Sequence, residues 1–161
     1  MQRFLFQTLK SVSMTDSPRY YILISDQENW DKSFEIKTWG FTERTKGSWN
    51  KSNVGELVAF YVTSPVKKIV GFGRITEKFI NDDIVWPDEF MFNRSMWKYK
   101  MKFEIIFKLN DSSAGVSVPA TMILNQSRKV ISKDLFFDLV KKSEEQWNVT
   151  IEEALTQKIT P

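Results

Sequence analysis

The sequence predicts an α+β domain in which a curved sheet of five to six strands, curled into a pseudo-barrel, packs against flanking helices. The pattern carries this prediction, because short β-branched and aromatic segments interleave with amphipathic ones without the regular rhythm of a doubly wound fold. The length of 161 residues suits one domain that buries a core without disulfides. The hydrophobic fraction of 42% and the charged fraction of 27% are typical of a globular protein.

The first strand and the first helix are predicted from a single stretch. "YYILIS" (20–25) has the β-branched and aromatic content of a strand. Asp26 follows as the N-cap of a helix over 27–37. Trp30 and Phe34 lie four residues apart on that helix, so they are expected to share one face.

The middle of the chain is predicted to consist mainly of strands joined by polar turns. Gly40 in "KTWGF" (37–41) marks a tight bend, and the polar, basic segment 43–53 is expected to be a loop. Gly71 and Gly73 indicate a bulge in the strand that contains them. The strands predicted here are 54–62, 69–79 and 99–109.

The last third is predicted to be helical. The segment 132–148 places apolar residues at helical spacing, and Thr150 with Glu153 predicts a capping box for a final short helix. We see no repeat and no linker. The chain is therefore expected to be a single domain over 18–161, preceded by an N-terminal extension, 1–17, to which we assign no role.

The absence of histidine and cysteine narrows the available chemistry. Zinc sites of the usual kind, Ser-His-Asp triads and Cys-His pairs cannot form. Acid–base catalysis would fall to groups such as Asp26, Asp88 or Tyr61. We therefore expect a binding protein rather than an enzyme, with no cofactor and no metal.

The charge balance permits nucleic acid as a partner. The net charge is +3 and the isoelectric point is near 9.0, which is mildly basic. No apolar run approaches the roughly 20 residues that span a bilayer. We expect no membrane partner and a cytoplasmic location.

Two motifs suggest chemistry that the surrounding sequence does not support. "GFGR" (71–74) lacks the third glycine of a phosphate-binding loop and lies within a predicted strand. "WPDE" (86–89) resembles half of a metal-dependent nuclease signature, but no Asp/Glu-x-Lys follows it. We interpret the first as a bulge and the second as a proline-containing turn with solvated acids.

Two of the six tryptophans stand apart from the rest. Trp39 and Trp86 lie beside a Gly or a Pro at the ends of predicted segments, where a ring can face a cleft and stack on a base. Spacing alone still favours the core for both. The segment 44–51 carries three basic residues and a tryptophan, which suits either a nucleic-acid backbone or a solvated loop.

Five segments in order resemble the EVE domain family: "YYILISDQENW", "TWGF", "VGELVAFYV", "IVGFGRI" and "VWPDE". With the apolar strand that follows, they cover about 19–158. Glu56 stands where the family commonly has Asp. The resemblance implies a PUA-like fold and kinship with YTH domains, which hold a methylated adenine in an aromatic cage. It also implies a reader of modified bases, chiefly cytosine or adenine, in DNA or RNA.

The resemblance further implies where such a base would be held. Ser25 and Asn29 would hydrogen-bond the base edge, and Trp39 and Trp86 would form walls. Only a flipped or single-stranded base could enter. The expected pocket residues are Ser25, Asn29, Trp30, Trp39, Gly40, Phe41, Tyr61, Trp86, Pro87 and Asp88. The expected contacts to the nucleic-acid backbone are Arg44, Lys46 and Lys51.

Two alternative hypotheses remain. One is a general RNA-binding module of PUA type, whose affinity would follow salt concentration rather than base modification. The other is an enzyme that acts on a base or a nucleotide.

Overall fold

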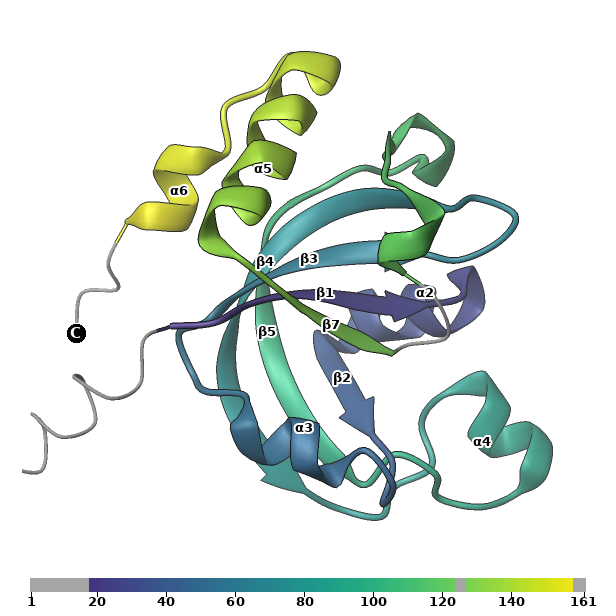
Figure 1. Ribbon diagram of the computed structural model, residues 1–161. Helices are drawn as coiled ribbons and strands as arrows, with labels where there is room; N and C mark the ends of the chain where they lie inside the picture. Colours follow the sequence, from purple (N-terminus) through teal and green to yellow (C-terminus); the bar gives the residue numbers. More distant parts are fainter. Residues whose placement is uncertain (1–17, 124–126, 158–161) are drawn as a thin grey trace, which may run out of the picture.

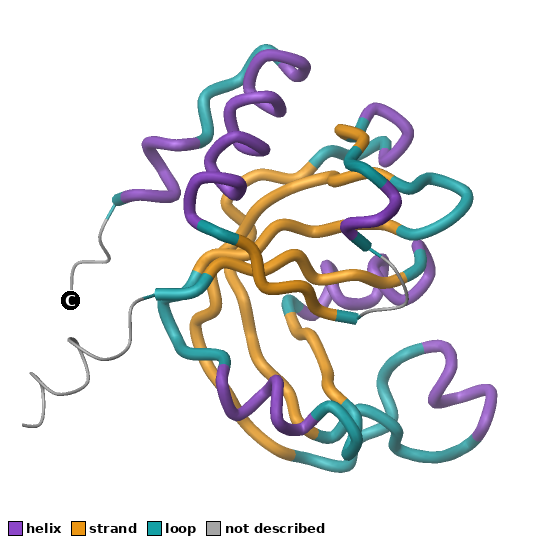
Figure 2. The backbone as a smooth tube through the Cα atoms, viewed as in Figure 1, coloured by secondary structure: helices purple, strands orange, loops and turns teal. Residues whose placement is uncertain are grey.

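The computed structural model describes residues 18–123 and 127–157, which form a seven-stranded sheet with helices on both faces (Figures 1 and 2). Within these residues, six strands follow the path β2-β5-β4-β3-β1-β7, and the short β6 pairs with β4. β1 is parallel to β3, whereas the other pairs are antiparallel. The strands are β1 (Tyr20–Ser25), β2 (Thr38–Phe41), β3 (Leu57–Val62), β4 (Lys68–Ile80), β5 (Tyr99–Lys108), β6 (Val116–Ser117) and β7 (Arg128–Ile131).

The helices lie between and after these strands. The α-helices are α2 (Gln27–Ile36), α3 (Lys46–Lys51), α4 (Pro87–Phe92), α5 (Lys133–Trp147) and α6 (Glu152–Thr156), and the 3-10 helices are η1 (Ser112–Ala114) and η2 (Ala120–Met122). The fold class predicted from the sequence, a curved sheet flanked by helices, is confirmed.

The sheet curls because its long strands are bulged. The pairing of β4 with β5 shifts register between Phe72 and Gly73 and again between Ile75 and Glu77. A β-bulge bends its strand and increases the local twist. Figure 1 shows β4 and β5 bending along their length, which gives the sheet its curl. The bulge predicted from the glycines of this strand is confirmed.

Alternation along β1 divides the interior into two clusters. Ile22 and Ile24 belong to one cluster, whereas Tyr21 and Leu23 belong to the other. This follows from the period of two in a strand, where successive side chains point to opposite faces. β3 alternates in the same way, so the sheet separates two hydrophobic layers.

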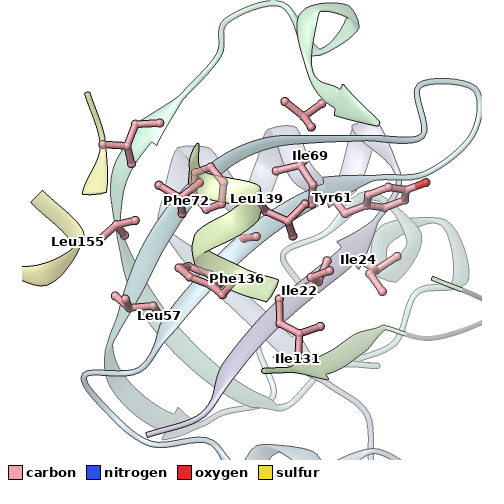
Figure 3. Close-up of a cluster of buried hydrophobic side chains, with 14 of the residues drawn as sticks. Ile22, Ile24, Leu57, Tyr61, Ile69, Phe72, Ile131, Phe136, Leu139 and Leu155 are labelled. Carbon is pink, nitrogen blue, oxygen red and sulfur yellow. The ribbon is translucent and has the colours of Figure 1, made fainter. Parts of the chain in front are cut away.

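Helix α5 covers the first layer, which we call the α5 face. Phe136, Leu139 and Val140 of α5 pack on aliphatic side chains of β1 and β3, and Leu155 of α6 joins them (Figure 3). Ser132 caps the helix by accepting a hydrogen bond from the Leu135 N–H at 3.1 Å. The predicted helix over 132–148 is therefore confirmed.

Helix α6 begins differently from the prediction. Ile151 is its N-cap, and no side chain of the expected Thr150 capping box is used. Instead, the Glu144 carboxylate of α5 accepts hydrogen bonds from the N–H groups of Ile151 at 2.7 Å and Glu152 at 2.8 Å. A side chain from the preceding helix thus satisfies the exposed donors of the helix start.

Helix α2 covers the second layer, which we call the α2 face. Trp30 is fully buried there and stacks on Phe34 at 4.7 Å between ring centroids, as predicted from their spacing. The N-cap is Asp26, whose carboxylate accepts from the Asn29 N–H at 2.8 Å. The predicted strand, cap and helix over residues 20–37 are confirmed.

Three segments differ from the prediction. Residues 38–41 form an edge strand rather than a bend at Gly40, and much of the basic loop is the short helix α3. The segment predicted to be a turn with solvated acids is the helix α4, and its Glu89 is fully buried. The expected extension over 1–17 lies outside the described residues. In the part of the chain that the structure describes, no helix is both long and apolar enough to cross a bilayer.

Candidate functional site

A cavity of about 640 Å³ lies where β1 ends and α2 begins. Its walls also come from β2, from the segment before α3, from the N-terminal end of α4 and from the start of β7. Three tryptophans, Trp39, Trp86 and Trp97, line it, and we call it the tryptophan cavity. Its volume lies within the roughly 300–1,000 Å³ of small-molecule sites.

The junction between β1 and α2 fixes the orientation of Asn29. The amide nitrogen of Asn29 donates to the Asp88 carboxylate at 3.3 Å and, more weakly, to the Asp26 carboxylate at 3.5 Å. Two carboxylates on the nitrogen side assign the amide unambiguously, because an oxygen there would face two acceptors. The carbonyl oxygen of Asn29 is buried and has no partner in the described structure.

Trp86 and Trp97 form an aromatic corner of the tryptophan cavity. Their rings meet edge to face, with 5.7 Å between centroids and 78° between planes. The indole N–H of Trp86 donates to the Ser33 hydroxyl at 2.8 Å, which fixes the ring against α2. A Cβ at Gly40 would lie 2.5 Å from the Trp97 Cβ and 3.0 Å from the Trp86 ring. Glycine at this position therefore permits the close approach of both tryptophans to β2.

The buried Glu89 carboxylate holds the two ends of this aromatic corner together. One oxygen accepts from the N–H groups of Val85 at 2.8 Å and Trp86 at 3.1 Å. The other oxygen accepts from those of Met96 at 2.8 Å and Trp97 at 3.0 Å. Four backbone donors thus converge on one fully buried side chain, and charge-assisted bonds of this kind are the stronger ones.

Trp39 belongs to both the cavity and the core. Only 6% of it is exposed, and its ring packs on Trp30 with 4.8 Å between centroids. The indole N–H groups of Trp30 and Trp86 each donate at 2.8 Å, but that of Trp39 has no partner in the described structure. Burial of an unpaired polar group is costly and uncommon in a native fold.

The unpaired polar atoms gather at this cavity. Among the described residues, four buried side-chain polar atoms have no hydrogen-bond partner, and three of them belong to residues that line the tryptophan cavity. Those three are the carbonyl oxygen of Asn29, the indole N–H of Trp39 and the Nε–H of Arg128. One acceptor and two donors on residues that line the cavity therefore have no partner within the described structure.

Arginines supply the charge of the cavity. Arg44 and Arg128 line it, and its described lining includes no Asp or Glu. The Arg128 guanidinium donates to the Ser52 hydroxyl at 2.8 Å and lies 4.4 Å from the centre of the Tyr21 ring. Burial lowers the pKa of Arg128, and the neighbouring Tyr21 partly opposes this shift. The lining favours a neutral or anionic ligand over a cationic one.

Sequence reasoning placed half of the expected pocket residues on the cavity wall. The structure brings together Ser25, Asn29, Trp39, Gly40 and Trp86. Of the three residues expected to contact phosphate, Arg44 lines the cavity. Lys46 and Lys51 are exposed on α3, at its first and last residues.

The other five expected pocket residues do not line the cavity, and three of them are core. Trp30 is fully buried behind Trp39, and its N–H donates to the Tyr61 carbonyl at 2.8 Å. Phe41 is 1% exposed in the α2 face, and Tyr61 is 4% exposed in the α5 face. Strand alternation explains Tyr61, because its neighbours Phe60 and Val62 point to the α2 face.

The remaining two expected pocket residues support side chains that line the cavity. Pro87 is the first residue of α4 and shapes the start of that helix. Asp88 reaches the site through its bond to the Asn29 amide. Both are half-buried and support lining residues rather than facing the cavity.

Sequence reasoning missed two prominent lining residues. Trp97 stands just before β5 but has neither Gly nor Pro beside it, so the criterion that singled out Trp39 and Trp86 did not select it. Arg128 carried no comparable signal, because it opens the four-residue strand β7, which was not predicted. Ser33 lies on the same helical face as Asn29, and the i,i+4 spacing is its only signal.

Comparisons with known proteins identify the fold. No protein-family model matches the chain, and no curated protein matches it significantly. A hypothetical protein from Leishmania major has 16% identity and a TM-score of 0.54, with 81% of this chain and 98% of that chain covered.

Two complexes with RNA are also similar in structure. A complex of the YTH domain-containing protein mmi1 with RNA has 12% identity and a TM-score of 0.54, covering 81% of this chain and 87% of that one. A crystal structure of the Mmi1 YTH domain with RNA has 11% identity and a TM-score of 0.53, covering 84% of each chain. At these identities the likeness establishes the fold, so this chain adopts the fold of YTH domains.

Proposed function

We propose that the chain is a binding module that holds a modified nucleobase, flipped from a duplex or in a single strand, in the tryptophan cavity. One observation carries the proposal: the cavity combines three tryptophans with three buried polar atoms that have no partner. A planar aromatic ligand with donors and acceptors along its edge would satisfy both features. A nucleobase is such a ligand.

The aromatic walls suit a base better than a flexible apolar ligand. Trp86 and Trp97 meet at 78°, so a flat ring that stacks on one of them presents its edge to the other. Stacking of a base on an aromatic side chain contributes about 1–3 kcal/mol. A methyl group on the base would add apolar area within the same walls, at about 25 cal/mol per Å² removed from water.

Two likenesses support the proposal. The order of the segments resembles that of EVE domains, which implies a reader of modified bases. The fold is that of YTH domains, and two similar structures are complexes with RNA. Membership of the EVE family is part of this proposal. The proposal covers both DNA and RNA as the ligand.

Binding is favoured over catalysis by the chemistry of the lining. An enzyme of this composition would need a carboxylate, a lysine or a tyrosine hydroxyl at the reacting atoms. Asp26 instead caps α2, and Asp88 accepts a bond from Asn29. Tyr61 is a core residue. Each of the three groups considered for catalysis therefore has a structural role in this fold.

Thermal shift with a panel of nucleosides tests the proposal. Adenosine, cytidine and their methylated forms would be compared, in the ribose and deoxyribose series. A ligand that binds the native state raises the melting temperature, and we expect the largest rise with a modified base. Equal shifts for modified and unmodified nucleosides, or none for any, would contradict the proposal. Oligonucleotide affinity that follows salt alone would favour the general RNA-binding hypothesis.

Trp97→Ala is the matched variant for this test. Trp97 is half-buried, so its truncation should lower stability less than that of a core tryptophan. We expect the preference for a modified nucleoside to disappear, with a decrease of about 1–3 kcal/mol in binding free energy. Trp147→Ala is the control, since Trp147 is also half-buried but lies on α5, outside the cavity. The control variant should keep the preference.

A further inference from the structure

Helix α4 exposes three large apolar side chains in a row. Phe90 is 65% exposed, Met91 is 72% exposed and Phe92 is 59% exposed. The other exposed large apolar residues of the described chain, Val54, Ile80 and Val130, are not consecutive with one another. We call Phe90–Phe92 the apolar tip. Contiguous exposed apolar groups often mark a binding surface.

The apolar tip stands on a rigid base. The buried Glu89 carboxylate accepts from the N–H groups of Val85 and Trp86 before the tip and of Met96 and Trp97 after it. Asn93 ends the helix in the left-handed region, and its N–H donates to the Glu89 carbonyl. The three side chains are therefore held outward by a closed loop. Such preorganisation lowers the entropy cost of binding.

The loop that carries the tip begins and ends at two walls of the tryptophan cavity. Trp86, the N-cap of α4, and Trp97, which follows the tip, both line the cavity. The Glu89 carboxylate that closes the loop also positions both tryptophans. Figure 1 shows α4 projecting from the sheet on the side where β1 ends and α2 begins. A strand whose base enters the cavity beside Trp86 and Trp97 would lie near this helix.

We propose that Phe90, Met91 and Phe92 form a stacking surface for the bases that flank the base held in the tryptophan cavity. This inference rests on the proposed function and adds that the module binds a short run of nucleotides rather than a lone base. Extruding a base exposes the faces of its neighbours to water. Apolar side chains such as Phe and Met can cover those faces, as wedges do in proteins that unstack bases.

Nucleic acid fits the apolar tip better than a protein partner. A standard protein interface buries about 800 Å² on each partner, which is more than three side chains supply. The exposed Arg94 follows the tip closely and suits a phosphate next to the stacked base. The tip also lies between two lining residues, Trp86 and Trp97, in the chain, and every polynucleotide ligand would bring flanking bases to that part of the molecule.

The test compares ligand lengths on one variant. The triple variant Phe90→Ala/Met91→Ala/Phe92→Ala would be titrated with the free nucleosides and with 11-nucleotide probes. Each probe carries N6-methyladenine or 5-methylcytosine at its centre, as single-stranded DNA, duplex DNA or single-stranded RNA. Val54→Ala is the control, because Val54 is 57% exposed and lies outside α4. Circular dichroism and melting temperature would verify that each variant folds.

We expect the triple variant to bind nucleosides as the unaltered protein does, within about twofold, and the best 11-nucleotide probe about tenfold or more weakly. The control should change neither affinity. A second variant, Phe90→Leu/Phe92→Leu, keeps the apolar area and removes the rings, and we expect an intermediate loss for the same probe. It also preserves the test should the triple variant fail to fold.

Each result that would contradict the stacking surface leads to a different conclusion. Unchanged probe affinity in the triple variant overturns the stacking surface but leaves the proposed function standing. Unchanged probe affinity together with a smaller mass by light scattering would identify the tip as a contact between protein chains, which also overturns it. Failure of the unaltered protein to bind any nucleoside or probe overturns both proposals.

Discussion

The α5 face and the α2 face of the same sheet are both buried, yet they are built from different side chains. The α5 face is mainly aliphatic, with Leu139 and Val140 packed on isoleucines of β1. The α2 face is rich in aromatic rings, among them Trp30, Trp39 and Phe60. The two also differ in their polar atoms, because Ser143 on the α5 side donates to the Leu139 carbonyl at 2.8 Å, whereas Trp39 on the α2 side has an unpaired N–H.

This difference distinguishes a face that only stabilises the fold from a face that carries the candidate site. A face whose buried polar atoms are all paired has no requirement beyond its own stability. A face that leaves donors and acceptors unpaired beside a cavity is where a bound molecule would gain most, because such groups cost free energy when they stay unpaired. The α2 face therefore contains the candidate site, and the α5 face stabilises the sheet that carries it.

The largest expected effect comes from truncating one large aromatic residue on each face. Phe136→Ala and Trp39→Ala should each lower the free energy of unfolding by about 3–5 kcal/mol, since Phe136 is fully buried and Trp39 is 6% exposed. Only Trp39→Ala should also remove nucleoside binding. Chemical denaturation and nucleoside titration below the melting temperature would measure the two effects.

Because Trp39 is buried, its truncation to alanine should lower stability as well as ligand binding. A ring that lay wholly in a cleft could be removed at little cost in stability, but the Trp39 ring packs on Trp30 at 4.8 Å. Trp39→Phe is therefore the complementary variant, because it keeps a ring in the core and removes the unpaired N–H. Equal loss of nucleoside binding in the Phe136→Ala variant would refute the separation of the two faces.

Local signals explain what could be predicted from the sequence. The strand at 20–25, the Asp26 cap and the helix after it follow from adjacent residues, and the junction between them brings Ser25 and Asn29 to the lining of the cavity. Trp39 and Trp86 were singled out by their position beside Gly and Pro. These features need only short-range spacing and residue type.

Long-range contacts explain what could not be predicted. Trp97 reaches the cavity because the closed loop around Glu89 brings it onto Gly40, and an acidic residue after a proline gives no hint of burial. Arg128 arrives through the antiparallel pairing of β7 with β1. Tyr61 was misplaced because alternation along β3 turns it to the α5 face, and the phase of that alternation depends on the packed sheet.

A smaller effect is expected from a satisfied aromatic residue on the α2 face. Tyr21 is fully buried, and its hydroxyl donates to the Glu56 carboxylate at 2.7 Å. Burial, and then the bond to Glu56, raises the pKa of Tyr21 to about 12, from a reference value of 10.0. The unfolded chain releases this proton near pH 10 while the native protein keeps it. Stability from this group is therefore complete below pH 10 and is lost as pH rises toward 12.

Tyr21→Phe sharpens the contrast with Trp39. In the unaltered protein the free energy of unfolding should fall between pH 10 and 12 by up to about 2–3 kcal/mol from this residue, and the variant should lack that part of the decline. Urea denaturation across the pH series measures it, and both proteins should run parallel between pH 7 and 9. Nucleoside binding should be unchanged, since Tyr21 has its partner within the protein. An identical decline in both proteins would contradict the assignment to Tyr21.

The smallest effect in free energy concerns the exposed basic residues next to the cavity. Arg44 lines its rim, and Lys46 and Lys51 stand at the two ends of α3. Removing one protein–phosphate interaction lowers the slope of log affinity against log salt by about one unit. Arg44→Gln/Lys46→Gln/Lys51→Gln should therefore weaken oligonucleotide binding and flatten its salt dependence, with little change in the melting temperature because all three side chains are exposed.

A matched control for these basic residues lies on the other side of the sheet. Lys133→Gln/Lys141→Gln/Lys142→Gln removes the same charge from exposed positions on α5, across the sheet from α2. A general electrostatic attraction would respond equally to both triple variants, because each lowers the net charge by three. If the nucleic-acid backbone instead lies along Arg44, Lys46 and Lys51, only the first triple variant should bind more weakly and show a lower salt slope. Equal salt slopes for the two variants would return α3 to a solvated role and leave nucleic-acid binding to the tryptophan cavity and the apolar tip.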